Sequence, residues 1–236
     1  MRKKIGKIIF NDRLVLEDEN IDVIGNVIEN IKSIYNNEEK EDFGIEKLIR
    51  LILASSQLVF LGTYIKHFAS KKGFTWRILS TDFYVLFKML FPLSILYFNL
   101  VSNIILVGIM IWFLCETFFL IPLLIFASDK YSRPRSYSRS MVLFFFNYME
   151  ISFDFAVFYS TGNYLNQTFN HWFDPIYFSI ITSTTIGYGD FHPVSFIGKL
   201  LVSMQGMITL TFIILFINFF VNKIDNKGYF SSKNKD

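Results

Sequence analysis

Long apolar stretches dominate the chain after residue 82. Three of them are long enough to supply the roughly 20 mostly apolar helical residues that cross a bilayer. They are residues 83–127, 141–161 and 194–221. The first is too long for one crossing, and polar, turn-prone residues divide it into helices near 83–100 and 103–127. The dividing residues are Asn99, Ser102 and Asn103. The pattern predicts four transmembrane helices, the first two forming a helical hairpin.

A further apolar segment, residues 171–193, lies between the third and fourth predicted spans. It is too short to cross the membrane twice as helices, so we expect it to enter and return on the same side. Non-helical backbone survives at membrane depth only where protein buries it or water lines it. The sequence therefore predicts an all-α membrane protein in which a re-entrant segment within residues 171–193 lines a pore or cavity.

The region before the hairpin is more polar. A short apolar run at 51–65 is interrupted by Ser55, Ser56 and Gln57, so the helix expected over 47–69 either lies in the membrane interface or crosses the bilayer. We favour an interfacial or partly inserted helix, because a fifth span would place the basic N-terminus outside.

Residues 1–46 are expected to form a small cytosolic cap. Residues 8–16 alternate in polarity like a short hairpin, and residues 21–35 have the period of an amphipathic helix. The predicted apolar face of this helix consists of Ile21, Ile24, Ile28, Ile31 and Tyr35.

Lysine and arginine residues are distributed unevenly between the predicted loops. They are absent from 98–103 and 159–174 but cluster on either side of the hairpin. The clusters are Lys66, Lys71, Lys72 and Arg77, and Lys130, Arg133, Arg135 and Arg139. By the positive-inside rule, both clusters and both termini face the cytoplasm of a plasma-membrane protein. The second cluster also suits anionic lipid headgroups, although the positive-inside topology explains the same residues.

Composition narrows the classes of function. Hydrophobic residues make up 52% and charged residues 18% of the chain, which is too apolar for one soluble domain of 236 residues. A net charge of +3 predicts no nucleic-acid partner. Cys115 is the single cysteine, and no Cys/His cluster, nucleophile motif or phosphate-binding loop is present, so we expect neither an enzyme nor an organic cofactor.

The re-entrant segment carries the sequence TTIGYGD at residues 184–190. This stretch resembles the selectivity filter of tetrameric potassium channels, whose TVGYG core is TIGYG here. The resemblance covers residues 141–221, with outer helix, pore helix, filter and inner helix in the same order. It implies a potassium-channel pore fold and passive, selective conduction of K⁺. It also implies a homotetramer, because four filter segments surround an ion and one chain supplies one.

The expected organisation has six parts. They are an N-terminal cytosolic region (1–46), an interfacial or partly inserted helix with a basic loop (47–82), a transmembrane hairpin (83–128), a basic cytosolic linker (129–140), a potassium-channel pore domain (141–222) and a short cytosolic tail (223–236).

The resemblance assigns the ion ligands to the filter backbone. Carbonyl oxygens coordinate the ion, and glycines accept the backbone conformations that a stack of carbonyls needs. The expected ion-binding residues are Thr185, Ile186, Gly187, Tyr188 and Gly189, with K⁺ held at the first four. The Thr185 hydroxyl is expected to supply the innermost ring of ligands.

Four further residues are expected to support the filter. Thr184 borders the cavity below it. The Tyr188 side chain points away from the ion axis and packs against Tyr177 and Phe178, and Tyr177 offers its hydroxyl to Asp190. The resemblance also implies a pore helix at residues 174–183, whose negative, C-terminal end points at the cavity and favours a cation there.

The inner helix contains candidate gate residues. The hinge glycine of related channels aligns with Thr209, and Gly206 lies one turn earlier, so hinge bending is either shifted or absent. Phe212, Phe216 and Phe220 recur every four residues, and they either form hydrophobic constrictions in the tetramer or face lipid or the outer helix. The regularly spaced arginines of a voltage sensor are missing, so conventional voltage gating is not expected.

Four ionisable residues lie inside the predicted spans, namely Lys88, Glu116, Glu150 and Asp154. Burying an ionised side chain in lipid costs free energy, so we expect these residues to form ion pairs with one another. Lys88 is within reach of Glu116 or Glu150, and such a pair would fasten the hairpin to the outer helix. Proton or voltage sensing by these carboxylates is the functional alternative.

Residues 166–168, Asn-Gln-Thr, match an N-glycosylation sequon on a predicted external loop. The motif is short and common by chance, so it carries little weight by itself.

Two other functions stay open. A weakly selective cation channel would share the fold, although an intact TIGYG disfavours it. A non-conducting membrane signalling subunit would keep the channel-like fold and bind a partner through its cytosolic cap.

Overall fold

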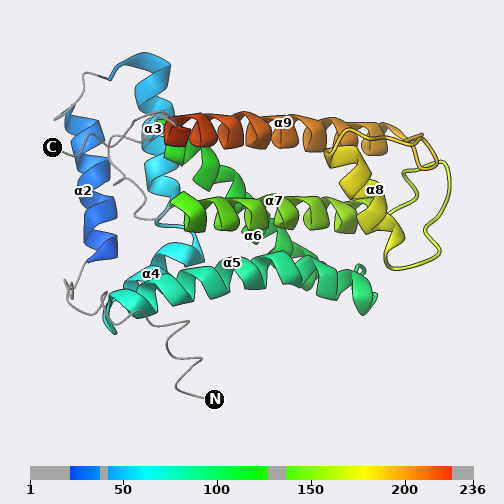
Figure 1. Ribbon diagram of the computed structural model, residues 1–236, viewed down its shortest axis with the longest axis horizontal. Helices are drawn as coiled ribbons and strands as arrows, with labels where there is room; N and C mark the ends of the chain where they lie inside the picture. The colour runs from blue at the N-terminus through cyan, green and yellow to red at the C-terminus, as the bar shows by residue number, and fades with distance from the viewer. Residues whose placement is uncertain (1–21, 38–41, 127–136, 225–236) are drawn as a thin grey trace, which may run out of the picture. The chain divides into compact units, whose positions relative to one another are not determined.

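The computed structural model describes residues 22–37, 42–126 and 137–224, which contain eight helices, α2 to α9 (Figure 1). The all-α prediction is confirmed for this part of the chain. The chain divides into two compact units. Unit 1 comprises Met1–Phe87 and Phe113–Arg133, and unit 2 comprises Lys88–Trp112 and Pro134–Asp236. The predicted hairpin at 8–16 lies outside the described residues.

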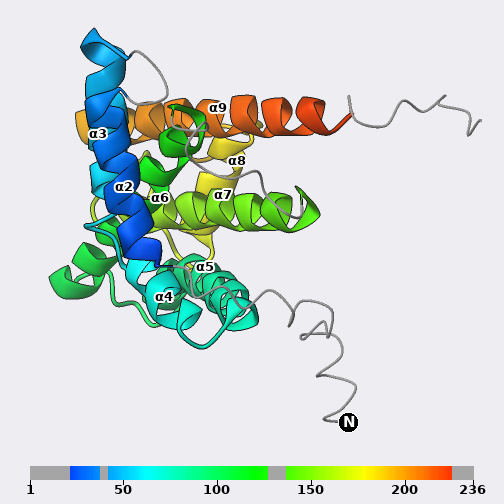
Figure 2. The ribbon, with the colours of Figure 1, turned by 90° about the vertical axis from the view of Figure 1, so that its left-hand side faces the viewer.

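Unit 1 contains three short helices together with the start of α5 and the end of α6. The short helices are α2 (Val23–Asn36), α3 (Gly44–Ser56) and α4 (Leu61–Ser70), and α2 packs beside α3 (Figure 2). The predicted helix at 21–35 is present, but its predicted apolar face is only partly covered: Ile24 and Ile31 are half-buried, and Ile21 lies outside the described residues. Val27 and Ile34 are buried, whereas Ile28 and Tyr35 are 41% and 68% exposed. Packing against α3 and α4, rather than the strongest sequence period, decides which side is covered.

The region 47–69 forms two helices instead of one. Helices α3 and α4 meet at 59°, and together they are apolar enough to make one broken span. Arg50 of α3 is buried despite its charge, because its guanidinium nitrogen Nη1 lies 2.9 Å from Oδ2 of the equally buried Asp42. The structure is thus compatible with both the interfacial and the spanning interpretation.

Helix α5 (Phe74–Tyr97) begins well before residue 83, where the sequence pattern predicts its start. The expected basic loop at 66–77 is therefore the end of α4, a short turn and the first turn of α5. The predicted start was too late because Arg77 interrupts the apolar period but not the helix: its amide donates to the Gly73 carbonyl at 3.2 Å, whereas Lys71 and Lys72 lie in the turn after α4.

The predicted break inside the hairpin is confirmed. After α5, Asn99 takes a left-handed φ of 54°, and the Leu100 amide donates to the Ile95 carbonyl at 2.8 Å, which closes the helix end. Asn103 then caps α6 (Ile104–Phe126), because its Oδ1 accepts from the Ile105 and Leu106 amides at 3.1 and 3.3 Å.

Unit 2 is built around α7 (Tyr137–Ser160), α8 (Asp174–Ser183) and α9 (Phe196–Ile224). Helices α7 and α9 run antiparallel, and α8 lies between them near the end where they are connected (Figures 1 and 2). The core joins α7 and α8 to the unit 2 parts of α5 and α6. Its fully buried members are Ile95, Leu96, Met110, Phe153, Ala156, Val157 and Ile176.

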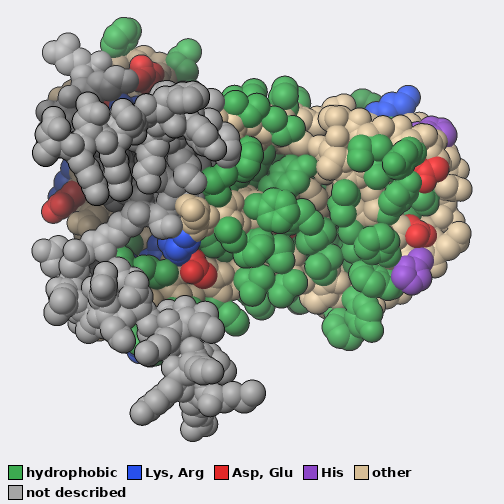
Figure 3. All heavy atoms as spheres, viewed as in Figure 1, with side chains coloured by type: hydrophobic (Ala, Val, Ile, Leu, Met, Phe, Trp, Pro, Cys, Tyr) green, Lys and Arg blue, Asp and Glu red, His purple; other side chains and the backbone are tan. Residues whose placement is uncertain are grey.

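Three described helices, α5, α7 and α9, are long and apolar enough to cross a membrane. The described apolar part of α6, Ile104–Leu120, is shorter than the roughly 20 residues of a full span. In unit 2, hydrophobic side chains cover the visible face over α7, whereas acidic and histidine side chains gather where the loops around α8 lie (Figure 3). This is the distribution of a membrane protein.

Candidate functional site

Helix α8 begins and ends where the sequence predicts, at Asp174 and Ser183. Asp174 Oδ2 accepts hydrogen bonds from the Asn170 and His171 amides at 2.8 and 2.9 Å. Pro175 occupies the first turn, where the missing N–H leaves no helical bond unmade. Six of its ten residues are buried, so α8 is a firmly held support for the loop that follows.

The loop after α8 is tied back to the end of the helix. The Ile181 carbonyl accepts from the Ile186 amide at 3.0 Å and from the Gly187 amide at 3.2 Å. The Thr185 amide donates to the Thr182 carbonyl at 3.1 Å. These backbone hydrogen bonds attach the start of the TIGYG segment to the C-terminal end of α8.

The backbone of the TIGYG segment alternates in the sign of φ. Thr185, Gly187 and Gly189 have φ of 60°, 53° and 85°, whereas Ile186 and Tyr188 keep negative φ. Glycine accepts this conformation without penalty, but for the β-branched Thr185 it costs about 1–3 kcal/mol. Strained backbone of this kind concentrates at functional sites.

The far end of the segment is held by the loop between α7 and α8. Asn166 Nδ2 donates to the Asp190 carbonyl at 2.9 Å, and Gln167 Nε2 donates to the same carbonyl at 3.2 Å. Asn166 Oδ1 accepts from the His192 amide at 2.8 Å. The side-chain amide that the sequon interpretation would glycosylate is therefore engaged at both ends. Sequence reasoning missed this role, since nothing in the local pattern pairs residue 166 with residues 190 and 192.

The aromatic packing around α8 differs from the expected one. The rings of Tyr177 and Phe178 contact Phe191, with centroid distances of 6.4 and 6.3 Å. Tyr188, which was expected in that position, is 72% exposed in the subunit. Tyr177 and Asp190 lie close enough to interact electrostatically.

Helix α9 runs without a break through Gly206 and Thr209. A Cβ added at Gly206 would meet no atom within 4 Å, and Thr209 is buried. In this subunit the two hinge candidates thus belong to one continuous helix.

The inner-helix phenylalanines occupy different environments. Phe212 is 2% exposed, and its ring lies 4.9 Å from Phe144 and 6.0 Å from Tyr148, both of α7. Phe216 is 41% exposed, and the Phe220 side chain lies outside the described part. Of the two alternatives, Phe212 thus fits packing against the helix before the re-entrant segment, α7, in this subunit.

The intramembrane charges form two separate groups. In unit 2, Lys88 Nζ lies 3.3 Å from Glu150 Oε1, and Asp154 interacts electrostatically with both. In unit 1, Glu116 accepts a hydrogen bond from the Tyr84 hydroxyl at 2.5 Å. Lys88 thus pairs with Glu150. Of the linker cluster, Lys130, Arg133 and Arg135 lie outside the described residues, and Arg139 lies in the first turn of α7.

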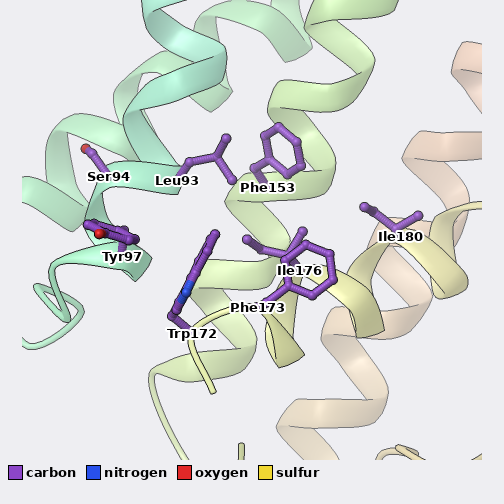
Figure 4. A pocket seen from close by; sticks show the side chains of 8 residues that line it. All are labelled: Leu93, Ser94, Tyr97, Phe153, Trp172, Phe173, Ile176 and Ile180. Atoms are coloured by element: carbon purple, nitrogen blue, oxygen red, sulfur yellow. The ribbon is translucent and has the colours of Figure 1, made fainter. Parts of the chain in front are cut away.

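A pocket of about 410 Å³ opens between α5, α7 and α8 within unit 2 (Figure 4). Its lining is apolar and aromatic apart from two hydroxyl groups. The residues are Leu93, Ser94, Tyr97, Phe153, Trp172, Phe173, Ile176 and Ile180. None of these side chains carries a charge, so the pocket is chemically distinct from the carbonyl-rich TIGYG segment.

Residues 141–226 match the family model for ion channels. The match identifies an ion-channel domain. It covers almost all of α7 together with α8, the TIGYG segment and α9, so the features described above lie largely inside it. No solved structure matches the chain. With its apolar helices, the protein is a membrane protein with an ion-transport domain.

Proposed function

We propose that the chain is one subunit of a homotetrameric, K⁺-selective channel that conducts passively across the plasma membrane, with both termini in the cytoplasm. The observation that carries K⁺ selectivity is the alternating backbone of residues 185–189. The ion-channel match over residues 141–226 supports conduction.

The alternation in φ gives the segment a backbone suited to dehydrated K⁺. In an extended strand successive carbonyls point to opposite sides, whereas an alternating sign of φ turns them toward the same side. Four copies around one axis would then form stacked rings of oxygens that replace the hydration shell of the ion. The proposed ligands are the carbonyls of Thr185, Ile186, Gly187 and Tyr188.

Exposure within a single subunit supports a tetramer. Tyr188 of the filter and Met207 of α9 are 72% and 73% exposed, although both are large and apolar or aromatic. Ile186, between two proposed ligands, is 54% exposed. Neighbouring copies around the pore axis would cover such surfaces in a tetramer.

The test is the reversal potential of purified protein in liposomes between K⁺ and Na⁺ solutions. Gly187→Ala and Gly108→Ala form a matched pair, because a Cβ at either glycine meets no atom within 4 Å. Only Gly187 has positive φ, at 53°, so only its alanine variant is strained. We expect the wild type and Gly108→Ala to reverse near the K⁺ equilibrium potential, and Gly187→Ala to lose K⁺ selectivity.

Three results would contradict the proposal. A wild-type reversal potential between the K⁺ and Na⁺ limits would favour a weakly selective cation channel. Absence of current from an intact oligomer would favour the non-conducting signalling subunit. Equal behaviour of Gly187→Ala and the wild type would show that the filter backbone does not set selectivity.

A further inference from the structure

Three buried polar residues, one from each helix of the ion-channel domain, meet at α8. They are Tyr159 of α7, Ser179 of α8 and Gln205 of α9, with exposed fractions of 1%, 0% and 0%. The Tyr159 hydroxyl donates to Gln205 Oε1 at 2.6 Å. Gln205 Nε2 donates to the Ser179 carbonyl at 3.0 Å and to Ser179 Oγ at 2.7 Å. One amide side chain therefore links all three helices.

The Gln205 amide is fixed at both ends. Its oxygen accepts one hydrogen bond and its nitrogen donates two, which uses both amide hydrogens. Within a membrane, neither Tyr159 nor Ser179 could replace a lost partner with bulk water. Rotation or sliding of α9 against α8 would thus leave buried polar groups unpaired, which is costly.

The position of α8 in turn determines the position of the first residues of the proposed filter. Ser179 Oγ, which accepts from Gln205, donates to the Ser152 carbonyl of α7 at 2.5 Å. Two residues further along α8, the Ile181 carbonyl holds the Ile186 and Gly187 amides. A short, continuous set of contacts therefore leads from Gln205 through α8 to the proposed ion ligands.

We propose that Gln205 is a positioning residue for the filter: its amide holds α8 in register with α7 and α9 and thereby sets the K⁺ affinity of the filter. The proposal rests on the proposed function. It follows that a displacement of α9 reaches the filter through the Gln205 side chain, and that α9 needs no direct contact with an ion ligand.

The experiment uses the full chain in liposomes, with Tyr159→Phe, Gln205→Leu and the double variant. Ser160→Ala is the matched control, because its hydroxyl bonds to the Ala156 carbonyl of its own helix at 3.0 Å. We would measure the half-saturating K⁺ concentration of the conductance, its limiting value, and the rise in melting temperature when K⁺ replaces Na⁺.

We expect the half-saturating K⁺ concentration to rise about threefold in Tyr159→Phe and about tenfold in Gln205→Leu, the sizes that loss of one and of several hydrogen bonds predict. The double variant should be no worse than Gln205→Leu, because Tyr159 acts through Gln205. Ser160→Ala should equal the wild type. A purely structural role would lower stability and leave the K⁺ dependence of conductance unchanged.

The proposal is overturned if assembled Gln205→Leu keeps the wild-type half-saturating K⁺ concentration, or if the two single effects add. If Gln205→Leu does not assemble, Tyr159→Phe decides alone, since it removes one hydroxyl and leaves Gln205 bonded to Ser179. Failure of the proposed function gives a different result. Wild type and Ser160→Ala would then either carry no current or show no preference for K⁺ over Na⁺ in conductance and melting temperature, which would end both proposals.

Discussion

Lys88 and Glu150 form a buried ion pair between α5 and α7, with Nζ 3.3 Å from Oε1 and side chains 3% and 0% exposed. We expect Lys88→Met to destabilise the protein by about 3–5 kcal/mol, because Glu150 stays buried without this counter-charge. Thermal unfolding in detergent measures the loss. The double variant Lys88→Met/Glu150→Met should recover most of it, since two apolar side chains then replace the pair. Failure of that rescue would show that the two residues do not act as a unit.

Asp154 lies one helical turn from Glu150 but, unlike Glu150, makes no ion pair closer than 4 Å among the described residues. Neither of its carboxylate oxygens has a hydrogen-bond partner among the described residues, and the side chain is buried. Asp154→Leu should therefore stabilise the protein by about 1–3 kcal/mol, whereas Glu150→Leu should destabilise it by removing the partner of Lys88. Melting temperatures of the two variants give the comparison. Equal losses in both would mean that assembly supplies Asp154 with a partner.

Gly62 allows Glu116 to approach α4. The Gly62 amide donates to Glu116 Oε1 at 3.2 Å, and a Cβ at residue 62 would collide with that oxygen. Tyr84 holds the carboxylate from the other side. Gly62→Ala should thus cost about 1–3 kcal/mol, and combining it with Glu116→Ala should add little to the cost of Glu116→Ala alone. Additive losses in thermal unfolding would contradict the contact.

Asn166 holds the C-terminal end of the proposed filter through the Asp190 carbonyl and the His192 amide. Asn166→Leu should lower the K⁺/Na⁺ permeability ratio about tenfold, the effect of losing one to two hydrogen bonds. Thr168→Ala is the control, because it destroys the sequon and keeps both bonds of Asn166. It should match the wild type in permeability. If both variants had the same lower permeability ratio, and a mass measurement showed that both had lost a glycan, the glycosylation interpretation would be favoured.

Alanine variants of Phe212 and Phe216 distinguish a packing role of these side chains from a gating role. Phe212→Ala should destabilise the protein by about 3–5 kcal/mol, because the ring is buried against α7. Phe216→Ala should cost less, since that side chain is 41% exposed. Thermal unfolding and open probability are measured together. A Phe212→Ala channel that stays fully stable but remains open would favour the hydrophobic gate.

Local sequence signals predicted the parts of the fold that local hydrogen bonds determine. The bounds of α8 were predicted with the channel resemblance, and the structure supplies the local cause of its start in Asp174 and Pro175. The break in the hairpin follows from Asn99 and Asn103, whose side chains and backbone end one helix and cap the next. The start of α5 was placed too late, because a basic residue such as Arg77 ends an apolar run without ending a helix.

Local features of this protein could be read from the sequence, whereas contacts between residues far apart in the chain could not. Periodicity, charge bias and the TIGYG motif determined the membrane class, the pore-like segment and the candidate ion ligands. Only the tertiary structure decided that Lys88 pairs with Glu150, that Phe191 rather than Tyr188 contacts Tyr177, and that Gln205 joins three helices. Tyr159 and Gln205 are 46 positions apart in the chain. A single sequence contains no distance information at that separation, because burial and geometry choose among chemically equivalent partners only once the helices have packed.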